Sequence, residues 1–404
     1  MQRLARSAQL VVLLALPATL RAQPALTAAT TIGKIDSIWS PTLKEGRKFL
    51  VYLPPSYRDS TFLPQTYPVL YLLDGEAHFH SVSGLIQILA TGVNGTFVVP
   101  EMIVVAITNT DRTRDMTPTH TEKDPTGKPA PFMKTSGGMA AFFQFMKSEL
   151  LPRIDSDYRA APYRVFVGHS LGGITTINAL YTIPETFNAY VAIDPSLWWD
   201  GNTLLKKARD YFSTPGLAGK ALFVGQANTI DATDTIPNQH FSAIVQFNGV
   251  LESYNQSGLR YGYKYYADDN HGSVPLAAEY DALRFIFSTY KVDFTRSLDQ
   301  PSSLTAHFAR VTESLGYQML PPERMVNLLG RVEMQRDTTK AIELFQLNAD
   351  LYPASYNAWS ALGDGWAARG DTKKAIAAYE RSLALNAKDL RASTQIKKLG
   401  EKKP

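Results

Sequence analysis

Short runs of branched and aromatic residues recur along most of the chain and alternate with stretches that favour helix. The first two runs alternate apolar with polar positions, and a turn at Lys44, Glu45 and Gly46 separates them, which predicts two paired strands. The later runs are mostly apolar, as in strands buried on both faces. The predicted strands are residues 31–43, 47–53, 67–74, 101–108, 164–167, 189–193, 221–224 and 261–266. Strands that alternate with helices indicate an α/β fold with a mostly parallel central sheet.

The pattern becomes wholly helical after about residue 299, and it repeats. Four apolar positions (Leu328, Ala341, Ile342 and Phe345) return 34 residues later as Leu362, Ala375, Ile376 and Tyr379. This period is typical of tetratricopeptide repeats, which are helix–turn–helix units. We therefore expect an all-α extension over residues 300–404 with two repeats, 323–355 and 356–389. An ordinary amphipathic bundle is the alternative, although it does not account for the matched period.

The N-terminus has the pattern of a signal peptide. Arg3 and Arg6 precede an apolar run at residues 10–16, and small residues follow up to a plausible cut after Ala22. The run is too short to span a bilayer, which needs about 20 residues. We expect a signal peptide over residues 1–22, no membrane span, and a periplasmic or secreted protein.

Composition narrows the chemistry. The 404 residues carry a formal charge of +4 and no cysteine, which excludes disulfides and thiolate catalysis within this sequence. The basic residues are scattered rather than clustered, so we expect no nucleic-acid partner.

One segment carries a specific catalytic motif. Gly168-His-Ser-Leu-Gly172 lies between a predicted strand and a predicted helix, which is the context of the nucleophile elbow of α/β-hydrolases. We expect glycine at both ends because a Cβ there would collide with neighbouring backbone. The motif predicts Ser170 as nucleophile and the Leu171 N–H as an oxyanion donor.

A serine nucleophile needs a base and a group that orients the base. Of the downstream histidines, His240 follows the strand before the last one and His307 falls in the helical extension. His271 directly follows the last predicted strand and is the predicted base. Asp231, on the loop after the strand at residues 221–224, is the predicted acid, ahead of Asp234. A Ser–His pair oriented by a backbone carbonyl or a water is the alternative.

The loop after the strand at residues 67–74 should supply the second oxyanion N–H, from Gly75 or Glu76. Glu76, His78 and His80 together resemble a metal cluster, but two histidines two residues apart without a further ligand nearby are more often pocket or surface residues. We predict no metal and no cofactor.

Aromatic and cationic side chains follow two of the strands. Trp198 and Trp199 come after one strand, and Arg112 and Arg114 after another. Such groups can stack on aromatic rings and pair with anionic oxygens, so they are candidate substrate-binding residues. The alternative is that the tryptophans pack a helix and the arginines form structural ion pairs.

These motifs together resemble one family. They are Tyr71-Leu-Leu-Asp-Gly-Glu76, Asn109-Thr-Asp-Arg-Thr-Arg114, Gly168-His-Ser-Leu-Gly-Gly173, Ile193-Asp-Pro-Ser-Leu-Trp-Trp199 and His271-Gly-Ser273. Residues 31–291 resemble the esterase family of α/β-hydrolases that includes enterochelin and bacillibactin esterases and esterase D-like enzymes. The resemblance implies serine ester hydrolysis without fixing the substrate. Some members of the siderophore-esterase branch work with a Ser–His pair, which keeps the role of Asp231 open.

The sequence thus predicts an exported serine carboxylic-ester hydrolase that acts on a small-molecule ester of siderophore-like or aromatic type. A protein or peptide partner could bind the repeats, which offer a concave surface. The alternatives are an acyltransferase that uses the same residues, and a repeat-mediated binding protein with a vestigial hydrolase domain.

Overall fold

The computed structural model describes residues 30–91, 96–124, 126–230 and 239–401. The chain divides into one unit of residues 1–32 and a second of residues 33–404. The predicted signal peptide and Asp231 lie outside the described residues. Within the described part, no helix has both the length and the apolar character needed to cross a bilayer.

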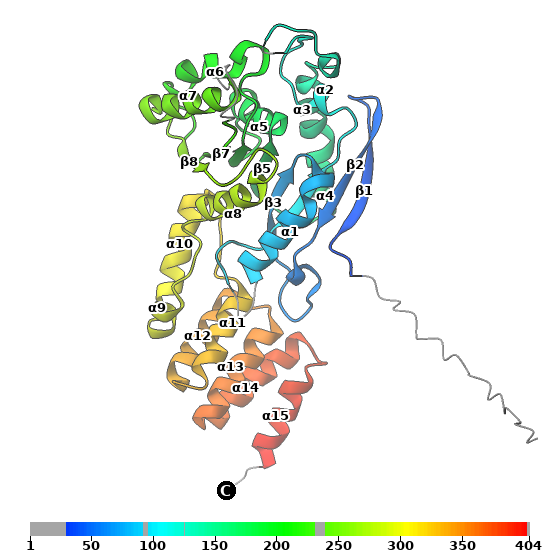
Figure 1. The fold of residues 1–404 in the computed structure, drawn as a ribbon. Coiled ribbons are helices and arrows are strands. Elements are labelled where there is room, and N and C mark those ends of the chain that lie inside the picture. The colour runs from blue at the N-terminus through cyan, green and yellow to red at the C-terminus, as the bar shows by residue number, and fades with distance from the viewer. Residues whose placement is uncertain (1–29, 92–95, 125, 231–238, 402–404) are drawn as a thin grey trace, which may run out of the picture. The chain divides into compact units, whose positions relative to one another are not determined.

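A single mixed sheet organises the second unit (Figure 1). Its strands, within the described residues, are β1 (Lys34–Ser40), β2 (Glu45–Tyr52), β3 (Tyr67–Leu72), β4 (Ile103–Ile107), β5 (Ala160–His169), β6 (Ala189–Ile193), β7 (Ala221–Ala227) and β8 (Arg260–Tyr266). Their spatial order is β1-β2-β4-β3-β5-β6-β7-β8. β2 pairs antiparallel with β1 and β4, and the remaining pairs are parallel. The predicted α/β class with a mostly parallel sheet is confirmed.

Helices cover both faces of the sheet. Alternate residues of β3 point to opposite sides, so Val69 and Tyr71 join one hydrophobic cluster while Leu70 and Leu72 join another. The first cluster includes residues of α3 (Met139–Phe145), α4 (Leu151–Asp157), α5 (Leu171–Thr182), α6 (Trp199–Phe212) and α7 (Gln239–Tyr254). The second includes residues of α1 (Gly75–Thr91) and α8 (Val274–Ile286). The α/β part is therefore a three-layer sandwich.

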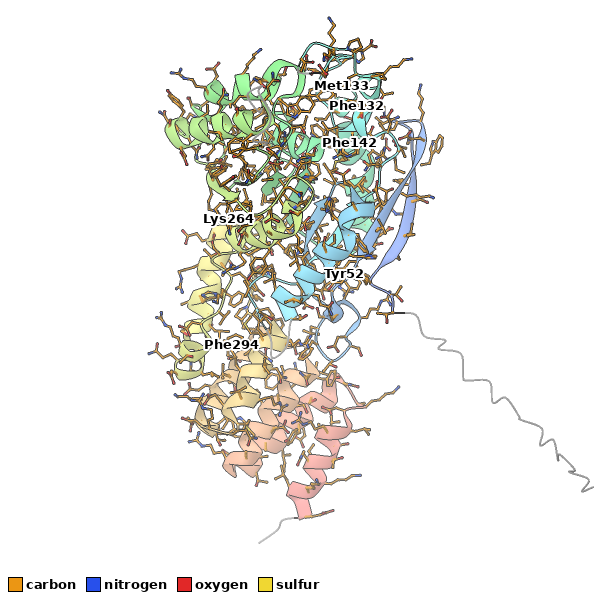
Figure 2. All side chains as sticks on the ribbon, in the orientation of Figure 1. Tyr52, Phe132, Met133, Phe142, Lys264 and Phe294 are labelled. Carbon is orange, nitrogen blue, oxygen red and sulfur yellow. The ribbon has the colours of Figure 1, made fainter. Side chains whose placement is uncertain are left out.

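The polar segment at residues 109–131 contains local structure. It includes the short helix α2 (Arg112–Asp115) and leads into the 3₁₀ turn Pro131–Met133. In that turn Phe132 is exposed, whereas Met133 is fully buried in the first cluster (Figure 2). A π-helical segment, Met146–Leu150, joins α3 to α4, and another 3₁₀ turn spans Pro55–Arg58.

The C-terminal part is helical, as predicted. It comprises α9 (Phe294–Asp299), α10 (Ser303–Leu315), α11 (Glu323–Glu333), α12 (Thr338–Leu351), α13 (Tyr356–Arg369), α14 (Thr372–Leu385) and α15 (Leu390–Glu401). The pairs α11/α12 and α13/α14 fall inside the two predicted repeats. Their assignment to the tetratricopeptide family stays a prediction.

The two helix pairs pack through equivalent contacts. A Cβ on Gly330 of α11 would lie 2.6 Å from Cδ1 of Phe345 on α12, and a Cβ on Gly363 of α13 would lie 2.6 Å from Cδ1 of Tyr379 on α14. Each glycine thus allows the aromatic ring of the following helix to lie against the backbone. The same glycine–aromatic contact therefore occurs in both helix pairs.

The extension shares its core with the sheet. Leu304 and Phe308 of α10 and Met325 of α11 belong to the same buried cluster as Leu70 of β3. The carboxylate of Glu323 also accepts the Leu63 N–H at 2.8 Å. The division into domains 31–291 and 300–404 therefore stays a prediction, because one hydrophobic cluster crosses it.

Gly330→Ala should lower the melting temperature. The added methyl group would overlap the fully buried ring of Phe345, and overpacking of a core typically costs about 1–3 kcal/mol. Gly249→Ala in α7 is the matched control, because a Cβ there meets nothing within 4 Å. The control should be neutral or more stable, since alanine favours helix over glycine by about 1 kcal/mol. Thermal unfolding of both variants measures the difference, and equal effects would contradict the packing argument.

Candidate active site

Ser170 lies in a sharp turn between β5 and α5. Its φ of 61° is in the left-handed region, which non-glycine residues adopt rarely and at a cost in strain. A Cβ on Gly168 would collide with the backbone of Gly172, as expected. The second requirement differs from the prediction: a Cβ on Gly172 would make only ordinary contacts at 3.5 Å, whereas one on Gly173 would lie 2.9 Å from Pro195 Cα. The tight positions are therefore 168 and 173.

His271 reaches Ser170 from the loop after β8. Its Nε2 lies 3.1 Å from Ser170 Oγ, and its Nδ1 lies 2.5 Å from Asp194 Oδ2. A carboxylate can only accept, so Nδ1 carries the proton in this hydrogen bond. The lone pair of Nε2 then faces the serine hydroxyl.

Asp194 follows directly after β6. His169 pairs with Ile193 in the parallel register of β5 and β6, so the residues that follow each strand, Ser170 and Asp194, leave the sheet at the same level. The side chain of Asp194 is fully buried, and its Oδ1 accepts the Ala227 N–H at 3.0 Å. Burial alone would raise the pKa of Asp194, but hydrogen bonds from His240, His271 and Ala227 hold that pKa below its ordinary value.

The predicted acid, Asp231, lies outside the described residues, so its role stays a prediction. Among the described residues, the carboxylate in contact with His271 Nδ1 is that of Asp194. In the sequence, Asp194 directly follows a fully apolar strand. The sequence does not show that this strand lies next to the strand that ends at His169.

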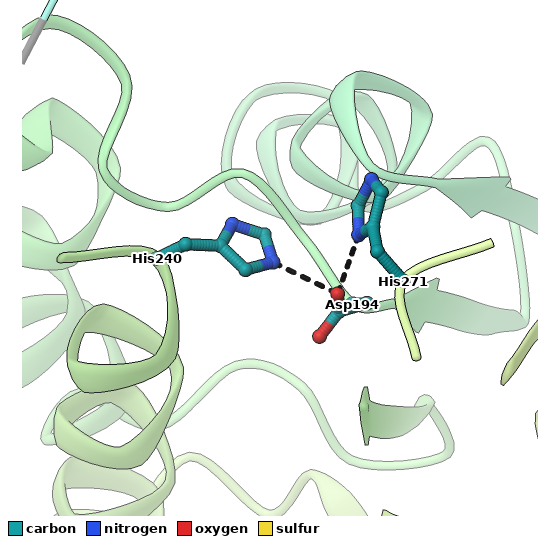
Figure 3. Close-up of side chains that lie close together, drawn as sticks. All are labelled: Asp194, His240 and His271. Atoms are coloured by element: carbon teal, nitrogen blue, oxygen red, sulfur yellow. Dashed lines mark hydrogen bonds and ion pairs between the residues drawn. The ribbon is translucent and has the colours of Figure 1, made fainter. Parts of the chain in front are cut away.

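His240, which the sequence analysis set aside, is also part of this cluster. It lies at the start of α7, and its Nε2 is 2.8 Å from Asp194 Oδ2. The two imidazoles thus converge on one carboxylate oxygen (Figure 3). Their ring centroids are 5.2 Å apart at nearly right angles. His307, in contrast, lies in α10, where its Nε2 is 3.2 Å from the Tyr290 carbonyl oxygen.

Asp194, His240 and His271 are residue types that bind metals, and their ligand atoms lie within 4.8 Å of one another. Zinc ligands, however, lie about 2.0–2.2 Å from the ion. A metal would have to displace both hydrogen bonds to Asp194, including the one that sets the proton on His271. We therefore interpret the three side chains as a hydrogen-bonded set.

The other candidate metal residues face different partners. Glu76 accepts a hydrogen bond from the Asn109 side chain at 2.8 Å, and His80 is exposed. His78 Nδ1 lies 3.8 Å from a carboxylate oxygen of Glu279 on α8. Glu279 is almost fully buried, which raises its pKa to about 8. The absence of a metal stays a prediction.

The backbone around Ser170 offers hydrogen-bond donors. Leu171 is the first residue of α5 and Gly75 the first of α1, and the first N–H groups of a helix lack partners within that helix. Both helices begin at the carboxyl ends of the adjacent parallel strands β5 and β3. Leu171, Gly75 and Glu76 therefore begin helices at the same edge of the sheet, and their oxyanion role stays a prediction.

Arg112 ties the loop after β3 to the elbow. Its Nε and Nη2 donate to the two oxygens of Asp74 at 2.6 and 2.9 Å, and Nη2 also donates to the His169 carbonyl at 3.2 Å. The Asp74 carboxyl is mostly buried, which opposes ionisation, but the Arg112 guanidinium keeps its pKa below the ordinary value. Arg112 is still one-third exposed, so part of it can face a ligand.

Arg114 and Trp199 have structural partners in place of a ligand. Arg114 donates to Glu45 at 2.7 Å and to the buried Asp115 at 2.7 Å. Trp199 is 1% exposed, and its indole N–H donates to the Thr119 carbonyl at 3.2 Å. These contacts correspond to the structural alternative and leave the predicted substrate role of both residues without support. Trp198 is only partly buried and remains a candidate.

His169 packs against His271. The His169 and His271 ring centroids are 4.5 Å apart. Burial, together with the neighbouring His271 and His78, lowers the pKa of His169 to about 4. The His169 ring is therefore neutral near pH 7 and does not add a positive charge beside His271.

Comparison with known proteins agrees with this geometry. The family model described as putative esterase matches residues 40–221. The ferri-bacillibactin esterase BesA of Bacillus subtilis is 34% identical over 158 residues, which cover 37% of this chain and 55% of BesA. The siderophore enterobactin esterase of Emericella nidulans is 29% identical over 168 residues, covering 38% of this chain and 52% of that enzyme. The chain thus spans about half the length of these curated relatives.

A solved structure matches over a longer region. The IroE-like serine hydrolase from Shewanella oneidensis superposes with a TM-score of 0.71 at 32% identity, and the match covers 79% of this chain and 99% of that protein. With Ser170 in a strained turn at the end of β5 and His271 within hydrogen-bonding distance of it, the chain belongs to the putative esterase family of α/β-hydrolases.

Proposed function

We propose that this protein is a serine carboxylic-ester hydrolase that works through an acyl-enzyme. The observation that carries the proposal is the continuous hydrogen-bonded line from Ser170 Oγ through His271 to Asp194, with separations of 3.1 and 2.5 Å. An unactivated serine hydroxyl is a weak nucleophile. It becomes a strong one when a positioned base takes its proton and a carboxylate orients that base.

In the proposed reaction, Ser170 Oγ attacks the ester carbonyl carbon while its proton moves to His271 Nε2. Asp194 stabilises the imidazolium that forms. The Leu171 N–H and an N–H from Gly75 or Glu76 bind the oxyanion of the tetrahedral intermediate. His271 then returns the proton to the leaving alcohol, which gives the acyl-enzyme. A water molecule attacks next by the same path and releases the carboxylic acid and free Ser170.

Neighbouring side chains support this chemistry. Ser196 Oγ lies 3.2 Å from Ser170 Oγ, so it offers the nucleophile a second hydrogen-bond partner in the ground state. Arg112 fixes the Asp74 turn against the elbow, which positions the N–H groups that follow Asp74. The neutral ring of His169 allows His271 to gain a proton without a second charge beside it.

We propose that the substrate is a siderophore-type ester. The relatives named above are esterases of bacillibactin and enterobactin, and this chain has partly exposed Trp198 and Arg112 near the elbow. An aromatic side chain and a guanidinium suit a ligand with aromatic rings and anionic oxygens. The proposal includes export and a possible peptide partner for the repeats, both on sequence grounds alone.

Ser170→Ala should abolish ester hydrolysis and covalent labelling by a fluorophosphonate probe. Loss of a serine nucleophile typically leaves only about 10³–10⁴-fold catalysis over water. The labelled peptide of the parent protein should contain Ser170 when analysed by mass spectrometry. Ser148→Ala, at an exposed position, is the matched control and should label like the parent. Turnover of Ser170→Ala within tenfold of the parent would end the serine-hydrolase proposal.

Asp194→Asn should reduce kcat by about three to four orders of magnitude, because an amide can hold His271 in the wrong tautomer. Asp231→Asn should change kcat less than threefold. Parallel kinetics on one activated ester compare the two variants directly. If Asp231→Asn loses more kcat than Asp194→Asn, Asp231 is the acid. If neither variant loses much kcat, a Ser–His pair is favoured.

Enterobactin or bacillibactin should be hydrolysed with a higher kcat/KM than p-nitrophenyl butyrate. Trp198→Ala should lower kcat/KM for the siderophore about three- to tenfold, which corresponds to the loss of one aromatic contact of about 0.5–1.5 kcal/mol. Trp39→Ala, at an exposed position of β1, is the control and should have no effect. A preference for the short ester that neither variant alters would contradict the proposed substrate class.

A further inference from the structure

One oxygen of Asp194 serves two imidazoles. Oδ2 accepts from His271 Nδ1 at 2.5 Å and from His240 Nε2 at 2.8 Å, and Oδ1 accepts from the Ala227 N–H at 3.0 Å. The carboxylate is fully buried. The proposed reaction uses His271 and Asp194 but gives His240 no role.

We propose that His240 is a positioning residue of the reaction, which holds the Asp194 carboxylate in place for His271. This inference rests on the proposed function and extends it to a residue outside the Ser170–His271–Asp194 line. The argument has a geometric part and an electrostatic part.

The geometric part concerns rotation of the carboxylate. Ala227 fixes Oδ1 only, and His271 belongs to the loop after β8, so these two contacts alone would allow carboxylate and base to shift together. His240 comes from a different element, α7, and reaches the same Oδ2. It therefore anchors the oxygen independently of the base. A base that must stay aligned with Ser170 Oγ depends on such an anchor, because small misplacements of reacting groups reduce rates strongly.

The electrostatic part concerns the charge that forms on His271. The rings of His240 and His271 are 5.2 Å apart, edge to face. A neutral His240 only donates a hydrogen bond to Asp194, whereas a protonated His240 would repel the imidazolium that forms on His271 during acyl transfer. Histidine is the side chain whose ionisation falls nearest to neutral pH.

Two variants separate these parts. His240→Gln keeps an N–H donor near the position of Nε2 but cannot ionise, and His240→Phe keeps a ring and loses the donor. The experiment measures kcat and kcat/KM on an activated ester from pH 4.5 to pH 8, with thermal unfolding to check that both variants are folded. We expect His240→Phe to lose at least tenfold in kcat with KM within about twofold, and His240→Gln to recover most of that loss.

Several outcomes would overturn the proposal. If folded His240→Phe keeps kcat within twofold and retains the parent pH profile, His240 has no part in positioning. If His240→Gln is as impaired as His240→Phe, the donor is not what matters. Failure of the proposed function itself is distinguished by the parent protein, which would then neither hydrolyse esters nor label at Ser170.

Discussion

The buried carboxylate of Asp194 is the constraint on which the rest of the site depends. A buried charge is costly unless hydrogen bonds replace the water it has lost. Its donors come from three places: the end of β7, the start of α7 and the loop after β8. All three elements have to be in place for their donors to keep the carboxylate ionised. The site is therefore a property of the whole carboxyl edge of the sheet, and a displacement of any one of these elements would remove one of the three donors to the charge.

The fold class followed from local sequence patterns, and so did the prediction of Ser170 and His271. Ser170 is recognisable because the turn around it needs particular neighbours, and His271 because it follows the last strand; the structure brings the two side chains within hydrogen-bonding distance. The contact between His271 and Asp194 was not predicted, because it depends on which strands are neighbours in space. His240 was missed for the same reason, since the start of α7 meets the end of β6 only in the folded sheet.

Burial explains the remaining differences. Trp199 and Trp198 are adjacent and chemically identical, yet one lies in the core and the other is partly exposed. No local pattern distinguishes them, because α6 begins at this point and its direction determines which ring turns inward. Arg114 likewise has carboxylate partners 69 positions earlier and one position later in the chain. Only the second of these is visible in the sequence.

The hydrophobic cluster that joins the sheet to the helical extension has a consequence for how the chain acquires its structure. Leu70 lies in β3, and its cluster also contains Leu329 and Leu344. During synthesis, Leu329 and Leu344 therefore leave the ribosome long after β3, when most of the chain has been made. Until then the part of this face of the sheet that α10, α11 and α12 cover lacks these partners, and an exposed apolar surface of this kind invites aggregation. Completion of this core thus waits on the last quarter of the polypeptide, which makes the extension part of the same folding unit as the sheet.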